Sequence, residues 1–128
     1  MDKLIKVLWA GLTAFFTYFF GGIDAIMGIL LAAVAIDYLT GVLAAIYTKA
    51  LSSEVGYKGI IKKVGILCIV ALSHLAGQAT GIDSIRSFAI GFYIANEGIS
   101  ILENTGRMGV PYPKKIMEVL AQLKSEKE

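Results

Sequence analysis

The feature that most constrains this chain is its apolar stretch at residues 23–47, in which the only charged side chains are Asp24 and Asp37. A helix needs about 20 mainly apolar residues to cross the roughly 30 Å hydrocarbon layer of a bilayer. The stretch is long enough, and a small soluble domain would have little interior in which to bury it. We therefore expect a transmembrane helix here.

Three further stretches are apolar enough to be considered, at residues 4–20, 64–82 and 85–104. The first is short and carries Lys6, so it either spans the bilayer or lies in the interface. Only 17% of all residues are charged, against about 25% in soluble domains. The sequence predicts an all-α integral membrane protein, one membrane domain over residues 1–128 with three to four transmembrane helices and a C-terminal amphipathic helix.

Basic residues gather in the segments that connect these stretches. Residues 48–63, expected to form a loop, carry Lys49, Lys58, Lys62 and Lys63. With four spans, every Lys and Arg except Arg86 would lie on the side of the two termini. That distribution is typical of the cytoplasmic face, so we predict a cytoplasmic loop, two cytoplasmic termini, and lysines held at the anionic inner surface of the membrane.

The tail at residues 111–128 begins with Pro111 and Pro113, which should end the preceding helix. Beyond them, apolar residues recur at intervals of three and four, as in an amphipathic helix. These residues are Ile116, Met117, Val119, Leu120 and Leu123. We expect this cytoplasmic helix to rest on the inner headgroups or on a neighbouring subunit; the alternative is a regulatory tail.

Polar side chains inside apolar stretches indicate where function resides. An acid at the centre of a membrane helix costs about 2.5 to 3.5 kcal/mol, so Asp37 should face protein or water. It shares a row of small residues with Gly41, and Gly77 belongs to a similar row on the third stretch. Such rows let helices approach closely, either within one monomer or between subunits.

The fourth stretch carries a polar stripe near its end. Its members are Asn96, Glu97, Ser100, Glu103 and Asn104. A stripe of this kind suits a water-filled lumen or a polar seam against a partner helix. In the alternative, the helix ends near Ile94 and the acids are solvated at the membrane surface.

Signatures of catalysis are missing from the sequence, which has no glycine-rich phosphate loop, metal-ligand cluster or nucleophile elbow. Asp37 and Glu97 suggest a proton relay only weakly, since no base is visible beside them. We expect no enzymatic activity, no cofactor or metal, and no nucleic-acid partner.

Several short motifs follow one another in a characteristic order between residues 24 and 123. They are Ile36 to Ala45, Ser52-Ser53, Gly56 to Ile60, Lys62-Lys63, Asn96 to Asn104 and Gly109 to Pro113. In these motifs the chain resembles the phage holins grouped with clostridial toxin-secretion holins. The resemblance implies a protein that oligomerises in the bacterial cytoplasmic membrane of a Gram-positive host and opens holes.

The holes of that family would release an endolysin, or in some clostridia a large toxin, without direct binding of the cargo. The expected partners are therefore further copies of the chain and membrane lipid. We expect the copies to associate through the small-residue rows and to turn their polar faces towards one another or towards water. Two alternatives stay open, a small oligomeric channel or transporter for a specific solute and a non-conducting scaffold.

Overall fold

The computed structural model describes the backbone of residues 2–127 and the side chains of residues 2–125. Its elements are five helices, and no strand occurs in that range. They are α1 (Asp2–Phe20), α2 (Ala25–Tyr47), α3 (Ser53–Thr80), α4 (Ser84–Arg107) and α5 (Lys114–Lys127). The predicted all-α fold is confirmed, and α1, α2 and α3 are each long and apolar enough to cross a membrane.

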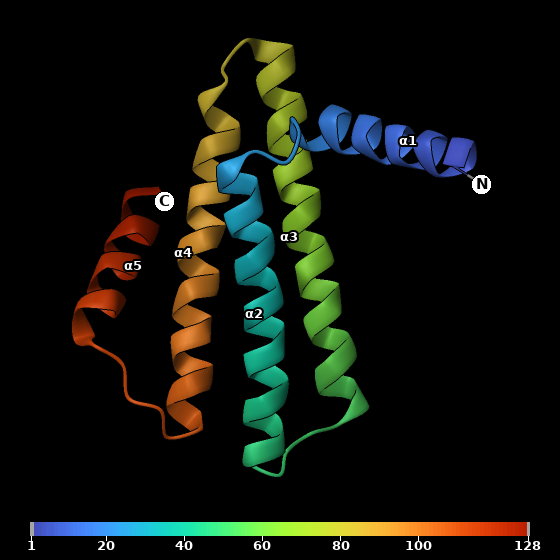
Figure 1. The fold of residues 1–128 in the computed structure, drawn as a ribbon. Helices are drawn as coiled ribbons and strands as arrows, with labels where there is room; N and C mark the ends of the chain where they lie inside the picture. Colours follow the sequence, from blue (N-terminus) through green and yellow to red (C-terminus); the bar gives the residue numbers. More distant parts are fainter. Residues whose placement is uncertain (1, 128) are drawn as a thin grey trace.

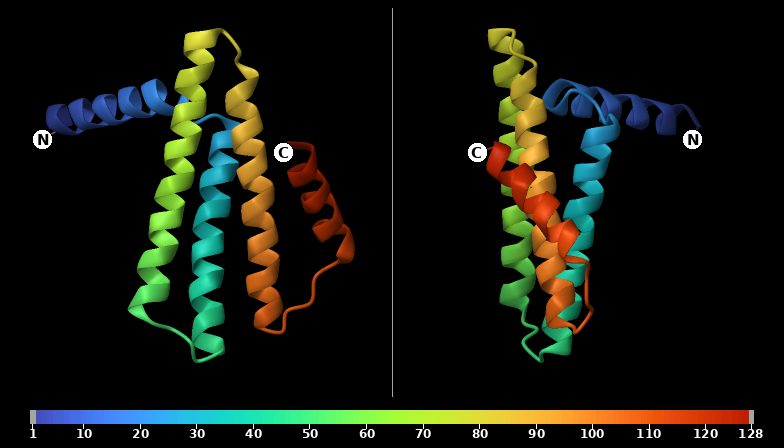
Figure 2. Two further views of the ribbon diagram at one scale, coloured as in Figure 1. Left: turned by 180° about the vertical axis from the view of Figure 1, so that it is seen from behind. Right: turned by 90° about the vertical axis from the view of Figure 1, so that its left-hand side faces the viewer.

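Helices α2, α3 and α4 run side by side as an elongated bundle (Figure 1). The turn between α3 and α4 projects beyond the start of α2, and α5 folds back along α4 (Figure 2). Although α4 is more polar than its neighbours, its 24 residues extend about 36 Å at 1.5 Å per residue. It is therefore as long as a membrane-crossing helix, with its polar groups placed against other helices.

Helix α1 projects sideways from the bundle, roughly perpendicular to its axis, instead of joining it as a fourth parallel member (Figures 1 and 2). Gly21 and Gly22, with φ values of 78° and 94°, form the elbow after α1, in a region of backbone conformation that glycine adopts without steric cost. Asp24 then caps α2, since its Oδ1 accepts a hydrogen bond from the Met27 backbone N–H at 3.2 Å. The elbow thus sets the direction of α1.

Helix α3 begins at Ser53, so the prediction of a loop over residues 48–63 is wrong. The Ser52 hydroxyl oxygen accepts a hydrogen bond from the Val55 N–H at 3.2 Å and caps the first turn of α3. An ion pair of 2.6 Å between Glu54 and Lys58, four residues apart, supports the same turn. Only residues 48–52 connect α2 to α3, and three of the four predicted loop lysines are helical.

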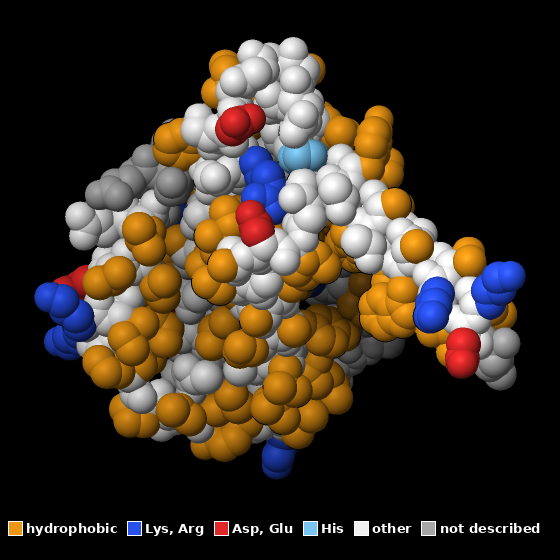
Figure 3. All heavy atoms as spheres, turned by 45° about the horizontal axis from the view of Figure 1, so that its top comes forward, with side chains coloured by type: hydrophobic (Ala, Val, Ile, Leu, Met, Phe, Trp, Pro, Cys, Tyr) orange, Lys and Arg blue, Asp and Glu red, His pale blue; other side chains and the backbone are white. Residues whose placement is uncertain are grey.

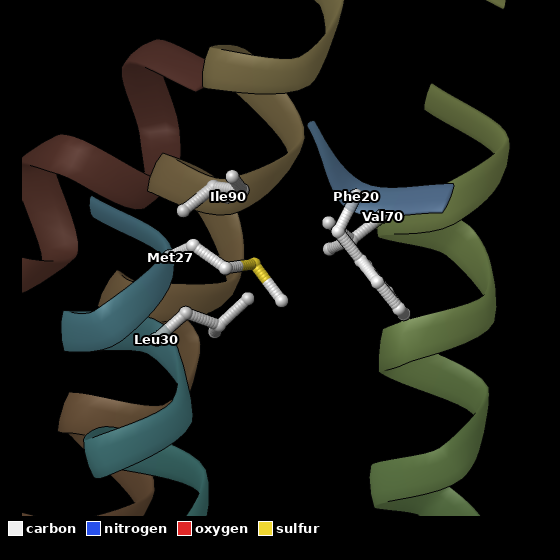
Figure 4. Packing of buried hydrophobic residues seen from close by; sticks show 5 residues of the cluster. All are labelled: Phe20, Met27, Leu30, Val70 and Ile90. Atoms are coloured by element: carbon white, nitrogen blue, oxygen red, sulfur yellow. The ribbon is translucent and has the colours of Figure 1, made fainter. Parts of the chain in front are cut away.

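The buried apolar core is small. Its main cluster is formed by Phe20, Met27, Leu30, Val70 and Ile90, which meet near the elbow and the middle of the bundle (Figure 4). Much larger is the exposed apolar surface, coloured orange in Figure 3. On α1 alone, Leu8 and Trp9 are 62% and 64% exposed. Such a surface needs lipid or other copies of the chain to cover it.

Helix α5 packs on α4 of its own chain, where either headgroups or a neighbouring subunit was expected. A Cβ built on Gly98 would lie 3.0 Å from the Leu120 side chain, so the absence of a side chain at Gly98 lets α5 approach. Lys124 Nζ lies 5.9 Å from the centre of the Phe92 ring. Ile116, Val119 and Leu123 of α5 remain exposed, and residue 128 of the predicted tail lies outside the described residues.

Candidate functional site

An ion cluster joins the three helices of the bundle in its interior. Lys63 on α3 donates hydrogen bonds from Nζ to Oδ2 of Asp37 on α2 and to Oε1 of Glu97 on α4, the latter at 2.6 Å. The side chains of Asp37 and Glu97 are only 8% and 3% exposed. Two acids that are far apart in the sequence therefore share one buried amine.

Asn104 also belongs to the cluster and lies on α4, two turns after Glu97. Its Nδ2 donates to Oδ1 of Asp37 at 2.9 Å and to Thr40 Oγ1 at 3.0 Å, while its Oδ1 accepts from Arg107 Nη2 at 2.6 Å. Within the described part of the chain, no buried side-chain nitrogen or oxygen lacks a hydrogen-bond partner. Polar groups paired this fully can persist in an apolar surrounding.

The cluster carries an excess of negative charge. Asp37 and Glu97 contribute two negative charges and Lys63 one positive charge when all three are ionised, which leaves a formal −1 among the groups bonded to Lys63. A buried ion pair is at best near balance between desolvation and attraction, and an uncompensated charge is costly. Water would therefore interact favourably with these three groups.

The small-residue row on α2 serves contacts within this chain. A Cβ built on Gly41 would meet Asn104 Nδ2 at 3.5 Å, and Ala45, one turn further, is buried. Gly41 thus contacts α4 of its own chain, and contact of the row with other subunits stays a prediction. Gly77 lies elsewhere, at the α3–α4 turn, where its Cβ position is 2.9 Å from the Ile82 carbonyl oxygen.

Two hollows flank the ion cluster. One, of about 360 Å³, lies between α2, α3 and α4 and reaches Asp37, Ser100 and Asn104. The other, of about 540 Å³, is lined by Asn96, Glu97, Ser100 and Glu103 of α4 together with residues of α3 and α5. The predicted polar stripe thus faces these hollows, and the alternative in which the helix ends near Ile94 is wrong because α4 continues to Arg107.

Lys63 is the residue that the sequence reading misplaced. It was predicted at the membrane surface, but its side chain is 16% exposed and lies between two acids. The signal that could have placed Lys63 in the interior is its spacing of three residues from Ile66 and seven from Val70, which puts it on the same helix face as these two buried residues. Lys58 and Lys62 remain exposed on α3, and Lys49 is exposed in the turn after α2.

Similarity to known proteins decides the family. Residues 14–125 match the bacteriophage holin family. The chain belongs to this family. The predicted resemblance is therefore confirmed, and it extends over the last part of α1, all of α2, α3 and α4, and most of α5.

Relatives of this holin-family chain occur in species of Listeria and Clostridium. The uncharacterized protein Lin0175 of Listeria innocua is 40% identical over 121 residues, which cover 94% of this chain and 86% of the relative. An uncharacterized 14.9 kDa protein in the nagH 3' region of Clostridium perfringens is 39% identical, covering 99% of this chain and all of the relative. No solved structure matches the chain.

A second polar group holds the elbow of this holin-family chain against α4. Arg86 donates to both carboxylate oxygens of Asp24, at 2.8 and 3.0 Å, and also to the carbonyl oxygens of Phe20 and Gly22. Figure 3 shows basic and acidic side chains gathered at this end. Arg86, the one basic residue predicted on the side away from the termini, is thus neutralised by Asp24. The two hydrogen bonds to the carboxylate form the bidentate geometry that a guanidinium group favours.

The hydrogen bonds from Arg86 hold the pKa of Asp24 below its ordinary value of 3.8. Because its pKa is lower in the folded chain, the ionised Asp24 carboxylate stabilises the elbow above pH 3.8. This stabilisation is lost as the pH falls through the pKa that Asp24 has in the folded chain. We expect acidification below 3.8 to release α1 from its fixed direction. Energy transfer from Trp9 to a dye on Cys68, the sole tryptophan and cysteine of the chain, measures this change.

The Asp24→Asn variant should show the changed energy transfer between Trp9 and the dye already at neutral pH. The control Asp2→Asn, on an exposed part of α1, should behave like the unmodified chain. An acid response that survives unchanged in Asp24→Asn would contradict the assignment to this ion pair.

No group of three or more His, Cys, Asp or Glu side chains that could hold a metal ion occurs among the described residues.

Proposed function

We propose that this protein is a holin that accumulates in the bacterial cytoplasmic membrane, associates with copies of itself and opens holes that release an endolysin. Its family membership supports this function, and so do the three helices able to cross a membrane. A large secreted toxin is the alternative cargo, and neither cargo needs to bind the chain.

The observation that carries the proposal is the net negative ion cluster inside an otherwise apolar bundle. Asp37, Lys63 and Glu97 satisfy one another in the closed monomer, but an excess carboxylate charge in a lipid environment remains unfavourable. Association that exposes the cluster to water lowers this cost. The closed chain is thus able to persist as a monomer while a wetted assembly becomes the favoured state at high membrane concentration.

Exposed apolar side chains on α2 and α3 provide surface for lipid before assembly and for other copies afterwards. They include Ile29, Ile36 and Leu39 on α2 and Ile69 and Leu72 on α3. Because lipid tails are as apolar as these side chains, association depends on close packing and polar contacts more than on hydrophobic burial. The ion cluster supplies polar groups for such contacts.

The positive-inside rule favours an orientation with the turn between α2 and α3 on the cytoplasmic side. Lys49, Lys58 and Lys62 are exposed at that end of the bundle. Arg86, near the opposite end, is paired with Asp24, while Lys3 and Lys6 are exposed on α1, which leaves the bundle at that same end. In this orientation the α3–α4 turn faces away from the cytoplasm, and the polar cluster lies between the two membrane surfaces.

Timed induction in bacteria tests the function directly. The chain is expressed with and without a co-expressed cytoplasmic endolysin while turbidity and membrane potential are followed. A holin gives an abrupt loss of potential after a delay, and turbidity falls only when the endolysin is present. A solute channel or transporter would leave cells viable without releasing the endolysin, and a scaffold would change neither signal.

Asp37→Leu should delay or abolish hole formation without preventing membrane insertion. The substitution removes one acid, so that Lys63 and Glu97 form a neutral pair and the closed bundle no longer buries an excess charge worth about 2.5 to 3.5 kcal/mol on insertion scales. Onset of lysis at matched membrane levels is the measurement. Asp83→Leu, at the exposed start of α4, is the control, and equal timing in both variants would count against a role for Asp37.

A further inference from the structure

The hollow of about 360 Å³ beside the ion cluster is lined by more basic than acidic side chains. Lys58, Lys62, Lys63 and Arg107 line it, with Asp37 as its acid. Four cations from two helices around one cavity repel one another unless an anion lies between them. We propose that this hollow binds the phosphate group of an anionic phospholipid.

Two of the four cations are available for a ligand. Lys63 is held by Asp37 and Glu97, and Lys58 is paired with Glu54. Among the described residues, no carboxylate lies within ion-pair distance of Lys62 or Arg107. Lys62 on α3 and Arg107 on α4 are therefore the charges that a phosphate would bridge. Nη2 of Arg107 donates to Asn104 Oδ1, and the other N–H groups of the guanidinium are donors suited to phosphate oxygens.

The position of the hollow favours a lipid as the source of the phosphate. Its wall includes Thr48 and Ala50 at the α2–α3 turn and Arg107 at the end of α4, so it lies towards the basic end of the bundle (Figure 1). Basic pockets between membrane helices at the cytoplasmic surface are suited to phospholipid headgroups. This inference rests only on the membrane location of the chain and not on hole formation.

Apolar surface next to the hollow offers a place for the acyl chains. Ile46, Tyr47, Leu51 and Val55 are exposed around the same turn, and Val42, Ala45 and Val55 continue the apolar lining into the hollow itself. A free phosphate ion would use the cations alone, whereas a phospholipid would use both surfaces. A bound headgroup would link α3 to the end of α4 and stabilise the closed bundle.

Lipid titration of the purified full-length chain in detergent tests the proposal. Phosphatidylglycerol, phosphatidylcholine and sodium phosphate are added separately, and bound lipid is counted by native mass spectrometry while the melting temperature is followed. We expect one phosphatidylglycerol per chain and a raised melting temperature. Stabilisation by phosphatidylcholine or by sodium phosphate equal to that by phosphatidylglycerol would overturn the assignment to an anionic lipid.

The double substitution Lys62→Gln with Arg107→Gln should weaken phosphatidylglycerol binding about 30-fold, from about a fivefold contribution of each cation near an anionic membrane surface. The matched control is Lys49→Gln with Lys115→Gln, which removes the same charge outside the hollow. Equal losses in the two double variants would show diffuse surface attraction and overturn the site. Lys62→Gln alone, on an exposed side chain, keeps the test decisive if loss of Arg107 disturbs folding, and it should weaken binding about fivefold.

Discussion

Replacing Lys63 by methionine is expected to lower the free energy of unfolding by about 3–5 kcal/mol, the cost of removing one partner from a buried ion pair. The substitution leaves Asp37 and Glu97 facing each other with no cation between them, although both are almost completely buried. The melting temperature of the purified chain in detergent, without added phospholipid, measures the loss.

The neighbouring Lys62 provides the matched control, because it lies on the same helix but is exposed. Lys62→Met should change the free energy of unfolding by no more than about 0.5 kcal/mol, as surface substitutions usually do. Adding Asp37→Asn and Glu97→Gln to Lys63→Met removes the unpaired charges and should restore most of the stability. If Lys63→Met melted at the same temperature as Lys62→Met, the three-residue cluster would not exist in the folded chain.

Gly77→Ala is expected to destabilise the chain by about 1–3 kcal/mol, the usual effect of inserting a methyl group into a packed site. The new Cβ would lie 2.9 Å from the backbone carbonyl oxygen of Ile82. Backbone in the tight α3–α4 turn cannot move aside as a flexible side chain could, so the turn itself must shift. Thermal unfolding in detergent is again the measurement.

Gly65 on the same helix has open space where its Cβ would be. Gly65→Ala should leave stability unchanged or raise it by up to about 1 kcal/mol, because alanine is the better helix former. The pair of variants separates the helix preference of alanine from the close contact at Gly77. Similar melting temperatures for Gly65→Ala and Gly77→Ala would mean that α3 and the turn do not approach as described.

Much of the secondary structure could be predicted from local sequence. The helices expected at 4–20, 23–47 and 85–104 correspond to α1, α2 and α4, within three residues at each end. Glycines at the elbow and prolines before α5 interrupt the chain by fixing or freeing the backbone of single residues. The start of α3 was missed because its first turns are rich in lysine, and charge obscured a helix that Ser52 caps.

The candidate site was only half visible in the sequence. Asp37, Glu97 and Asn104 were selected because polar groups in apolar stretches need partners, and all three belong to the cluster. Their common partner Lys63 was assigned to a loop at the membrane surface. It lies 26 residues from Asp37 and 34 residues from Glu97 along the chain, a separation at which local periodicity carries no information.

The sequence by itself determined the properties of each separate segment. These are its tendency to form a helix, its length, its apolar surface and the presence of acids that need a polar or charged partner. Tertiary structure alone decided that Lys63 pairs with Asp37 and Glu97, that α1 projects sideways from the bundle and that α5 packs on Gly98. The physical reason is that the apolar pattern of a membrane helix specifies contact with something non-aqueous without specifying which surface. Pairing of charges and close approach at glycine then select one arrangement among those that the pattern permits.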